Sequence, residues 1–362
     1  ELLRIKCTEL TRAHATFTES YLGGSIYQNV TLGGTDRYGN QSDNELSKLV
    51  LKAGINVKTW QPTLSVKWNN QMSDEFKNSV VECIKSGSGY PALFSDSLGL
   101  NRLMNKTGAS LEDARDWAPC GCVDMQISGK RMPMYAISHT NNLKILELIL
   151  NNGVNSTTGD KLIDSSLDIE KATFDDLFNE YCRLMRVILE KEEKCCNTIM
   201  VVHNDLGLVH PFMSALLDDC LKVGKHAYEG GSRYSDSAYV ISCGMVDVAN
   251  SLAAIKKIVY DEAKLSLPEL INILKENFEG YEEIQKALID APKYGNDDDF
   301  VDEFLVKLYD EWSIAASNVE NWIGDGSKWQ PSTLSVTTQV LLGKACGASP
   351  DGSKAHDALS DG

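Results

Sequence analysis

The residues best suited to chemistry are a cysteine and an aspartate two positions apart, Cys122 and Asp124. Gly121 precedes the aspartate and Gly129 follows it closely, so the backbone around the pair can turn tightly. A neighbouring carboxylate raises the pKa of a thiol and makes it a poor thiolate nucleophile. The pair suits a reaction in which sulfur gives up a hydrogen atom and the carboxylate moves protons. A buried structural cysteine is the alternative that spacing alone leaves open.

Other candidate residues are fewer. Tyr135 and His139 follow the pair and are predicted to line a substrate pocket, although a structural, hydrogen-bonded histidine is the alternative for His139. The adjacent cysteines Cys195 and Cys196 follow a charged helical run and are interpreted as structural. A thiolate hydrolase would need a histidine within hydrogen-bond reach of Cys122, and the sequence offers no adjacent candidate.

Composition limits the possible partners. The 362 residues carry a net charge of −16, which argues against a nucleic-acid partner because phosphate binding needs a basic face. No apolar run approaches the roughly 20 residues of a membrane span. The ten cysteines lack a Cys-x2-Cys pattern, so no metal site is predicted. Residues 87–92 fit Gly-x-Gly-x-x-Ala, but they follow a helical pattern and enter a strand, unlike a dinucleotide site. We expect a cytoplasmic protein with reduced thiols.

Strands and helices alternate, which predicts an α/β fold, and the short strands and many loops favour a barrel. Strands are predicted at 26–32, 61–68, 90–94, 198–203 and 239–243. Helices are predicted at 1–20, 44–51, 74–86, 111–117, 142–150, 172–193, 212–224, 245–263, 267–277, 280–290 and 300–318. No long linker divides the chain, so residues 1–362 are predicted to form one domain.

Residues 121–124, Gly-Cys-Val-Asp, resemble the Gly-Cys-Val-Glu signature of glycyl radical enzymes, the pyruvate formate-lyase superfamily. Further segments resemble the family in the same order along the chain: 33–36, 44–47, 61–68, 90–96, 143–153, 229–234, 247–257 and 349–354. The resemblance implies a portion of a ten-stranded β/α barrel, with Cys122 on a loop inside it. It also implies a homodimer.

The resemblance implies a specific chemistry as well. An activating enzyme with S-adenosylmethionine and an iron–sulfur cluster makes a glycyl radical, which generates a thiyl radical at Cys122. That radical takes a hydrogen atom from a small-molecule substrate. Asp124 stands where the family usually has glutamate and is expected to move protons.

No Arg-Val-x-Gly-Tyr-like radical motif occurs in the chain, which begins at Glu1 and stops after a Pro-Asp-Gly segment. We therefore expect an internal piece of the catalytic domain, without an N-terminal part and without the C-terminal glycine radical domain. Such a piece binds no cofactor of its own and is inactive alone.

The Cys-x-carboxylate pattern resembles the lyase branch, whose dehydratases and decarboxylases cleave C–O, C–C, C–N or C–S bonds. Pyruvate formate-lyase, a formate C-acetyltransferase, instead has two adjacent cysteines in this loop, whereas here Gly121 separates Cys120 from Cys122. Formate C-acetyltransferase activity and a catalytically silent barrel fragment are the alternatives.

Overall fold

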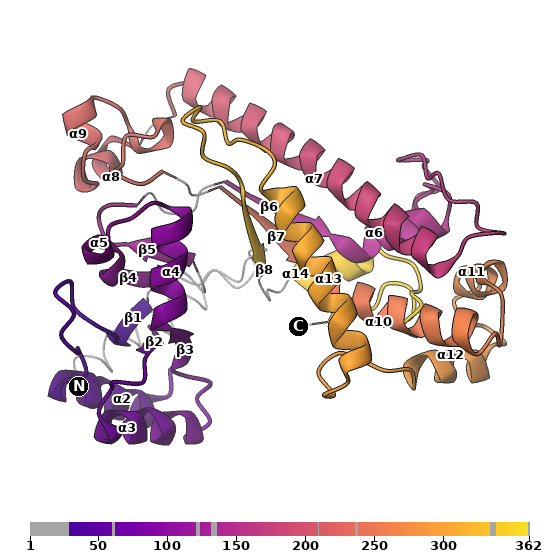
Figure 1. Cartoon of the computed structure of the whole chain (residues 1–362), viewed down its shortest axis with the longest axis horizontal. Helices are drawn as coiled ribbons and strands as arrows, with labels where there is room; N and C mark the ends of the chain where they lie inside the picture. Colours follow the sequence, from indigo (N-terminus) through magenta and orange to yellow (C-terminus); the bar gives the residue numbers. More distant parts are fainter. Residues whose placement is uncertain are drawn as a thin grey trace. The chain divides into compact units, whose positions relative to one another are not determined.

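The structure is a computed structural model that describes residues 29–59, 62–120, 124–131, 136–208, 210–235, 238–333 and 338–360. The chain forms two compact units that interleave in sequence. The first unit contains Glu1–Met134 and Gly207–Ser237, and the second contains Tyr135–Leu206 and Ala238–Gly362. Both combine parallel sheets with helices, as the prediction of an α/β fold requires (Figure 1).

The first unit is built on a parallel sheet with strand order β1-β2-β3. Its strands are β1 (Asn29–Gly33), β2 (Thr63–Trp68) and β3 (Ala92–Ser95). Its helices are α2 (Glu45–Val57), α3 (Asp74–Lys85), α4 (Asp96–Lys106), α5 (Leu111–Arg115), α8 (Pro211–Leu216), α9 (Cys220–Val223) and the short 3-10 helix η1 (Ala227–Glu229).

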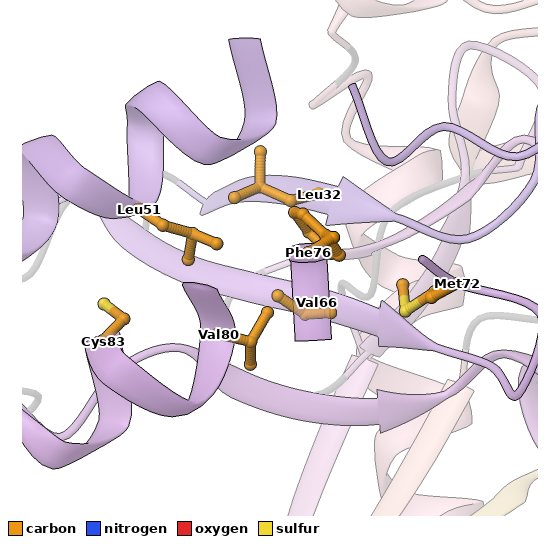
Figure 2. Packing of buried hydrophobic residues seen from close by; sticks show 7 residues of the cluster. All are labelled: Leu32, Leu51, Val66, Met72, Phe76, Val80 and Cys83. Atoms are coloured by element: carbon orange, nitrogen blue, oxygen red, sulfur yellow. The ribbon is translucent and has the colours of Figure 1, made fainter. Parts of the chain in front are cut away.

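One face of this sheet packs on α2 and α3. Alternate residues of a strand point to opposite faces, and Leu32 lies in register with Val66 on the helix-covered face. Figure 2 shows the resulting apolar cluster, made of Leu32, Leu51, Val66, Met72, Phe76, Val80 and Cys83. The opposite face of β2 carries polar side chains, including Ser65 and Lys67. Burial lowers the pKa of Lys67, whose Nζ donates to the Arg115 carbonyl at 2.8 Å.

Helix starts in the first unit are set by short polar side chains. Asn44, Ser73, Ser95 and Ser110 are the N-caps of α2, α3, α4 and α5, and each side chain accepts a hydrogen bond from a backbone N–H in the first turn. Such caps satisfy amide groups that have no partner within the helix. The helix predicted at 111–117 ends earlier, at Arg115.

An antiparallel hairpin follows α5 and consists of β4 (Trp117–Cys120) and β5 (Asp124–Ile127). Trp117 pairs with Ile127, and both join Leu103, Ala109 and Ala114 in a second apolar cluster. The indole nitrogen of Trp117 donates to the carboxylate of Asp96 at 2.8 Å. One end of the hairpin is thereby anchored in a core, while Cys120 and Asp124 pair at its other end.

The second unit contains a parallel sheet with strand order β6-β7-β8. Its strands are β6 (Ala136–Asn141), β7 (Ala238–Cys243) and β8 (Gln330–Thr333). Its helices are α6 (Asn142–Leu150), α7 (Phe174–Asp205), α10 (Met245–Ile255), the π-helix η2 (Lys256–Asp261), α11 (Leu267–Lys275), α12 (Glu282–Ile289), α13 (Asp299–Ala316) and α14 (Thr338–Lys344). Helix α7 packs on β6, α6 and α13, and α13 also packs on α10.

The strand predicted at 198–203 is wrong, because these residues belong to the 32-residue helix α7. Its run of β-branched residues has strand propensity, but a helix that starts at a capping box of Thr173 and Asp176 continues through it. Local propensity is a weak preference that helical and tertiary context override. Within the described parts of the chain, no helix is both long and apolar enough to cross a membrane.

Candidate functional site

Asp124 is the predicted catalytic residue that the structure describes most fully. It is the first residue of β5, pairs across the hairpin with Cys120, and is 6% exposed. Cys122 and Tyr135 lie outside the described residues, so their predicted roles stay predictions. The chain therefore places a carboxylate out of water directly after the cysteine-containing segment.

Two donors hold the Asp124 carboxylate. Arg131 approaches Oδ1 through a guanidinium nitrogen at 3.4 Å, and only 2% of its side chain is exposed. The Gln126 side-chain amide donates to Oδ2. Arg131 also donates to the Met125 carbonyl at 2.8 Å. A buried carboxylate is tolerated where an opposite charge and hydrogen bonds accompany it, and Asp124 has both.

A tight turn after β5 brings Arg131 to Asp124. Gly129 has a φ of +69°, which glycine adopts without the strain of a Cβ, and the amides of Lys130 and Arg131 both donate to the Ile127 carbonyl at 3.0 Å. Arg131 also pairs with Tyr234 in an isolated parallel bridge. The turn therefore joins the hairpin to a segment about a hundred residues further along the chain.

Asp113 fixes this turn from the other side. Its carboxylate accepts from Lys130 Nζ at 2.5 Å, from the Tyr234 hydroxyl at 3.0 Å and from Arg233 at 3.4 Å. Burial alone raises the pKa of Asp113, but these donors outweigh burial and bring the pKa below its ordinary value. Lys130 and Arg131, adjacent in sequence, thus serve two different carboxylates.

His139 lies on β6 in the second unit and is half-buried. Its neighbours Ser138 and Thr140 both donate to the Glu192 carboxylate of α7, so they point to the helix-covered face. Because side chains alternate along a strand, His139 points to the opposite face, in register with Ile241. Burial lowers the pKa of His139, so its imidazole is neutral at pH 7.

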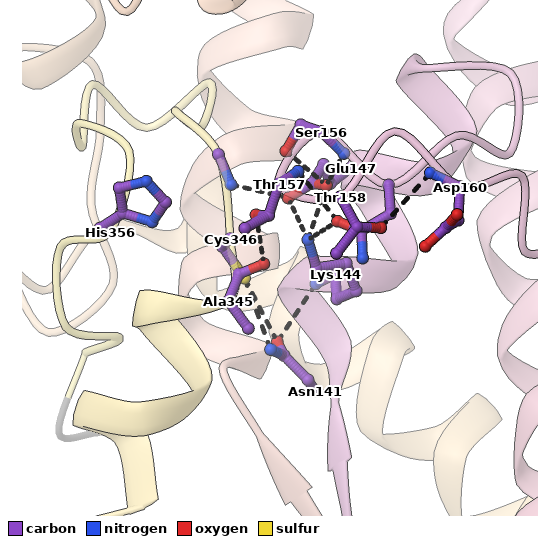
Figure 3. A network of polar contacts seen from close by, with 12 residues as sticks. Asn141, Lys144, Glu147, Ser156, Thr157, Thr158, Asp160, Ala345, Cys346 and His356 are labelled. Atoms are coloured by element: carbon purple, nitrogen blue, oxygen red, sulfur yellow. Dashed lines mark hydrogen bonds and ion pairs between the residues drawn. The ribbon is translucent and has the colours of Figure 1, made fainter.

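The second unit also contains a cavity of about 530 Å³ between α6, α11 and the 347–356 segment. One wall is a polar network in which Glu147 accepts from Lys144, Ser156 and the Gly347 amide (Figure 3). Neither Asp124 nor His139, the two predicted site residues that the structure describes, lines this cavity. Among the residues that the structure describes, no three His, Cys, Asp or Glu side chains are arranged to hold a metal ion.

The remaining sequence motifs have ordinary surroundings. Cys195 is exposed on α7, and burial raises the pKa of its neighbour Cys196. Residues 87–89 follow α3 and lead toward β3 rather than opening a helix, which is not the geometry of a dinucleotide site. The sequence interpretation missed Gln126 and Arg131. Strand alternation from Asp124 would have indicated Gln126, but no local pattern indicates Arg131.

These features define an α/β protein with a buried carboxylate, held by two donors, directly after a cysteine-containing segment. A family model described as "Pyruvate formate lyase-like" matches residues 1–343, and the chain belongs to this family. The resemblance inferred from the sequence is thereby confirmed.

Individual relatives agree. The chain is 30% identical over 391 residues to an indoleacetate decarboxylase from Tractidigestivibacter scatoligenes, covering 100% of this chain and 44% of that protein. It is 33% identical over 339 residues to a (2S)-3-sulfopropanediol dehydratase from Klebsiella oxytoca, covering 92% of this chain and 40% of that protein. The chain thus spans less than half the length of these relatives.

Solved structures give the same fold. The glycerol-bound, B12-independent glycerol dehydratase from Clostridium butyricum matches with a TM-score of 0.84 at 31% identity, covering 93% of this chain and 42% of that one. Hydroxyproline dehydratase from Clostridioides difficile matches with a TM-score of 0.85 at 28% identity, covering 96% of this chain and 43% of that one. The predicted fold, a portion of that of the glycyl radical enzymes, is confirmed.

Proposed function

We propose that the full-length protein to which this chain belongs is a glycyl radical lyase that removes water or carbon dioxide from a small organic substrate. The main support is Asp124, a buried carboxylate two residues after Cys122 and held by Arg131 and Gln126. Relatives that are dehydratases and decarboxylases support the same reaction class.

In this proposal Cys122 transfers the hydrogen atom and Asp124 transfers the proton. The glycyl radical of the family supplies the hydrogen-atom chemistry that turns the Cys122 thiol into a thiyl radical. The Cys122 sulfur takes a hydrogen atom from a substrate C–H bond and forms S–H. In a dehydration, Asp124 accepts a proton from a substrate hydroxyl, the neighbouring C–O bond breaks, and the leaving hydroxide receives that proton as water. The product radical takes its hydrogen atom back from Cys122, so the reaction is redox-neutral.

The other family features belong to the proposal as well. An activating enzyme that uses S-adenosylmethionine and an iron–sulfur cluster is the expected partner. Tyr135 and the neutral His139 are proposed to line the substrate pocket. A homodimer and a cytoplasmic location are predictions, which size-exclusion chromatography and cell fractionation test.

The test is anaerobic activation of the full-length protein, followed by assays with diols, hydroxyproline, choline, isethionate, arylacetates, and pyruvate plus coenzyme A. We expect turnover of a diol, hydroxyproline or an arylacetate, its abolition in Cys122→Ala, and a fall of about 100-fold or more in kcat in Asp124→Asn. Cys195→Ala on the exposed part of α7 is the matched control and is expected to retain wild-type turnover. Formate production from pyruvate that Asp124→Asn leaves intact would contradict the proposal.

A further inference from the structure

The side-chain amide of Gln126 uses its nitrogen in a hydrogen bond, whereas its oxygen has no partner among the described residues. The residue is 8% exposed and follows Asp124 by two positions on β5, so the two side chains share a face of the strand. Its Nε2 donates to Asp124, and its Oε1 is buried with no hydrogen-bond partner among the described residues. Ile127, on the opposite face, packs in the core with Trp117.

The chemistry of the two groups fixes the orientation of this amide. A carboxylate accepts hydrogen bonds and donates none, so the nitrogen of Gln126 must face Asp124. Rotating the amide by half a turn would place its oxygen against the carboxylate oxygen. Because Nε2 faces Asp124, the acceptor Oε1 points away from it.

A buried acceptor without a donor costs free energy, and folded proteins rarely leave one except where a ligand or water completes it. Other buried polar atoms without partners occur in the second unit, such as the indole nitrogen of Trp312 and the hydroxyl of Ser251. Gln126 differs from them because its side chain donates a hydrogen bond to Asp124, the predicted proton-transfer residue. The group missing here is a hydrogen-bond donor, so a carboxylate or ether oxygen of a ligand does not fit.

We propose that Gln126 is a substrate-binding residue, whose Oε1 accepts a hydrogen bond from a hydroxyl group of the substrate. The contact would hold the substrate next to the strand that carries Asp124. Asp124 then takes its proton from a second group of the substrate, because the single hydrogen of a hydroxyl cannot bond Gln126 and pass to Asp124 at once. This inference rests on the proposed function and deepens it, because it restricts the substrates to alcohols with a hydroxyl near the bond that breaks. Arg131 keeps its place on the other carboxylate oxygen as a positioning residue.

Binding to the full-length protein without activation tests the contact apart from turnover. Ligand-observed NMR would compare trans-4-hydroxy-L-proline with L-proline, and propane-1,2-diol with propan-1-ol, where each second compound lacks one hydroxyl. Wild type is expected to bind a hydroxyl-bearing member at least 10-fold more tightly than its counterpart. Gln126→Met, which keeps the length and removes both polar atoms, is expected to weaken that binding about 10- to 100-fold and to leave the counterpart unchanged.

The matched control is Gln285→Met in the second unit, where the glutamine donates to the Gly352 carbonyl; its ligand affinities should equal those of wild type. Affinities of Gln126→Met within threefold of wild type would overturn the inference, and so would equal losses for both members of a pair. A wild type that prefers neither hydroxyl-bearing compound overturns it without any variant, so a misfolded variant does not block the test. Turnover after activation is scored separately, so an inactive protein with Gln126-dependent binding refutes the proposed function and not this contact.

Discussion

Helices α6 and α7 pack together, and each carries a buried carboxylate, Glu147 on α6 and Glu193 on α7. The two carboxylates differ in their hydrogen-bond partners. Glu147 accepts from Lys144 at 2.7 and 2.8 Å, from the amide and hydroxyl of Ser156, and from the Gly347 amide at 2.8 Å. Glu193 is fully buried, and within the described residues neither of its oxygens has a hydrogen-bond partner. Burial raises its pKa to about 9, so it is a neutral acid at pH 7.

The difference shows what a buried carboxylate needs in order to stay charged. Donors from three different segments surround Glu147, so its charge is compensated. Glu193 has no such donors among the described residues, and burial favours its neutral acid form instead. Asp124, with an arginine and an amide on its two oxygens, belongs with Glu147. Asp124 therefore has partners of the kind that Glu193 lacks among the described residues.

The largest effect is expected at the ion pair of Arg131 and Asp124, in which both side chains are almost fully buried. Arg131→Gln leaves Asp124 buried without its opposite charge and should destabilise the hairpin by about 3–5 kcal/mol. Hydrogen exchange of residues 117–131 in the full-length protein measures this loss, with the exposed Arg37→Gln as control. Unchanged exchange in Arg131→Gln would show that Asp124 does not depend on the guanidinium.

The next effect tests Glu147. Replacement by leucine removes every bond to the carboxylate and leaves Lys144 without its partner, so we expect a loss of about 2–4 kcal/mol. Faster hydrogen exchange should appear at residues 153–157 and 347–353, which the carboxylate joins. The exposed pair of Lys85 and Glu82 gives the control Glu82→Leu, for which no change in these segments is expected. Equal exchange in Glu147→Leu and Glu82→Leu would show that the bonds of Glu147 do not stabilise these segments.

The sequence predicted the elements that have strong local signals. Helix 142–150 was predicted with the bounds that the structure shows, because an apolar face and an Asn-Asn-Gly end define it. Asp124 was identified by its spacing from Cys122 and by the family resemblance. The proposed function of the site also rests on that resemblance and not on composition, and the catalytic role of Asp124 stays a prediction.

The missed features depend on contacts between distant segments. Strand β6 pairs with β7 about a hundred residues later, and its polar residues give no clear strand pattern. Arg131 reaches Asp124 only because the turn at Gly129 is fixed by Asp113 and Tyr234, which lie in two other segments. Pairing between segments far apart in the chain is set by the tertiary fold, and a local window cannot contain it.

The smallest expected effect is a gain in stability, from a substitution at Glu193, and it depends on pH. The pKa of Glu193 is about 9 in the folded protein against an ordinary value of 4.5, so between these values the folded state binds a proton that the unfolded state releases. Folding stability therefore falls as pH rises through this window. Glu193→Met removes both the ionisable group and its unpaired oxygens, and should stabilise the full-length protein by about 2 kcal/mol at pH 8 and by less at pH 5.

Urea denaturation at pH 5 and pH 8 measures this difference, and the exposed Glu190→Met on the same helix is the control. A variant with the same pH dependence as wild type would show that Glu193 is charged in the folded protein. Because no described residue donates to its oxygens, a charged Glu193 would require a rearrangement that brings a donor to it. Glu193 would then be a buried carboxylate with a donor, as Glu147 is. A buried position with hydrogen-bond donors would no longer distinguish Asp124 from Glu193.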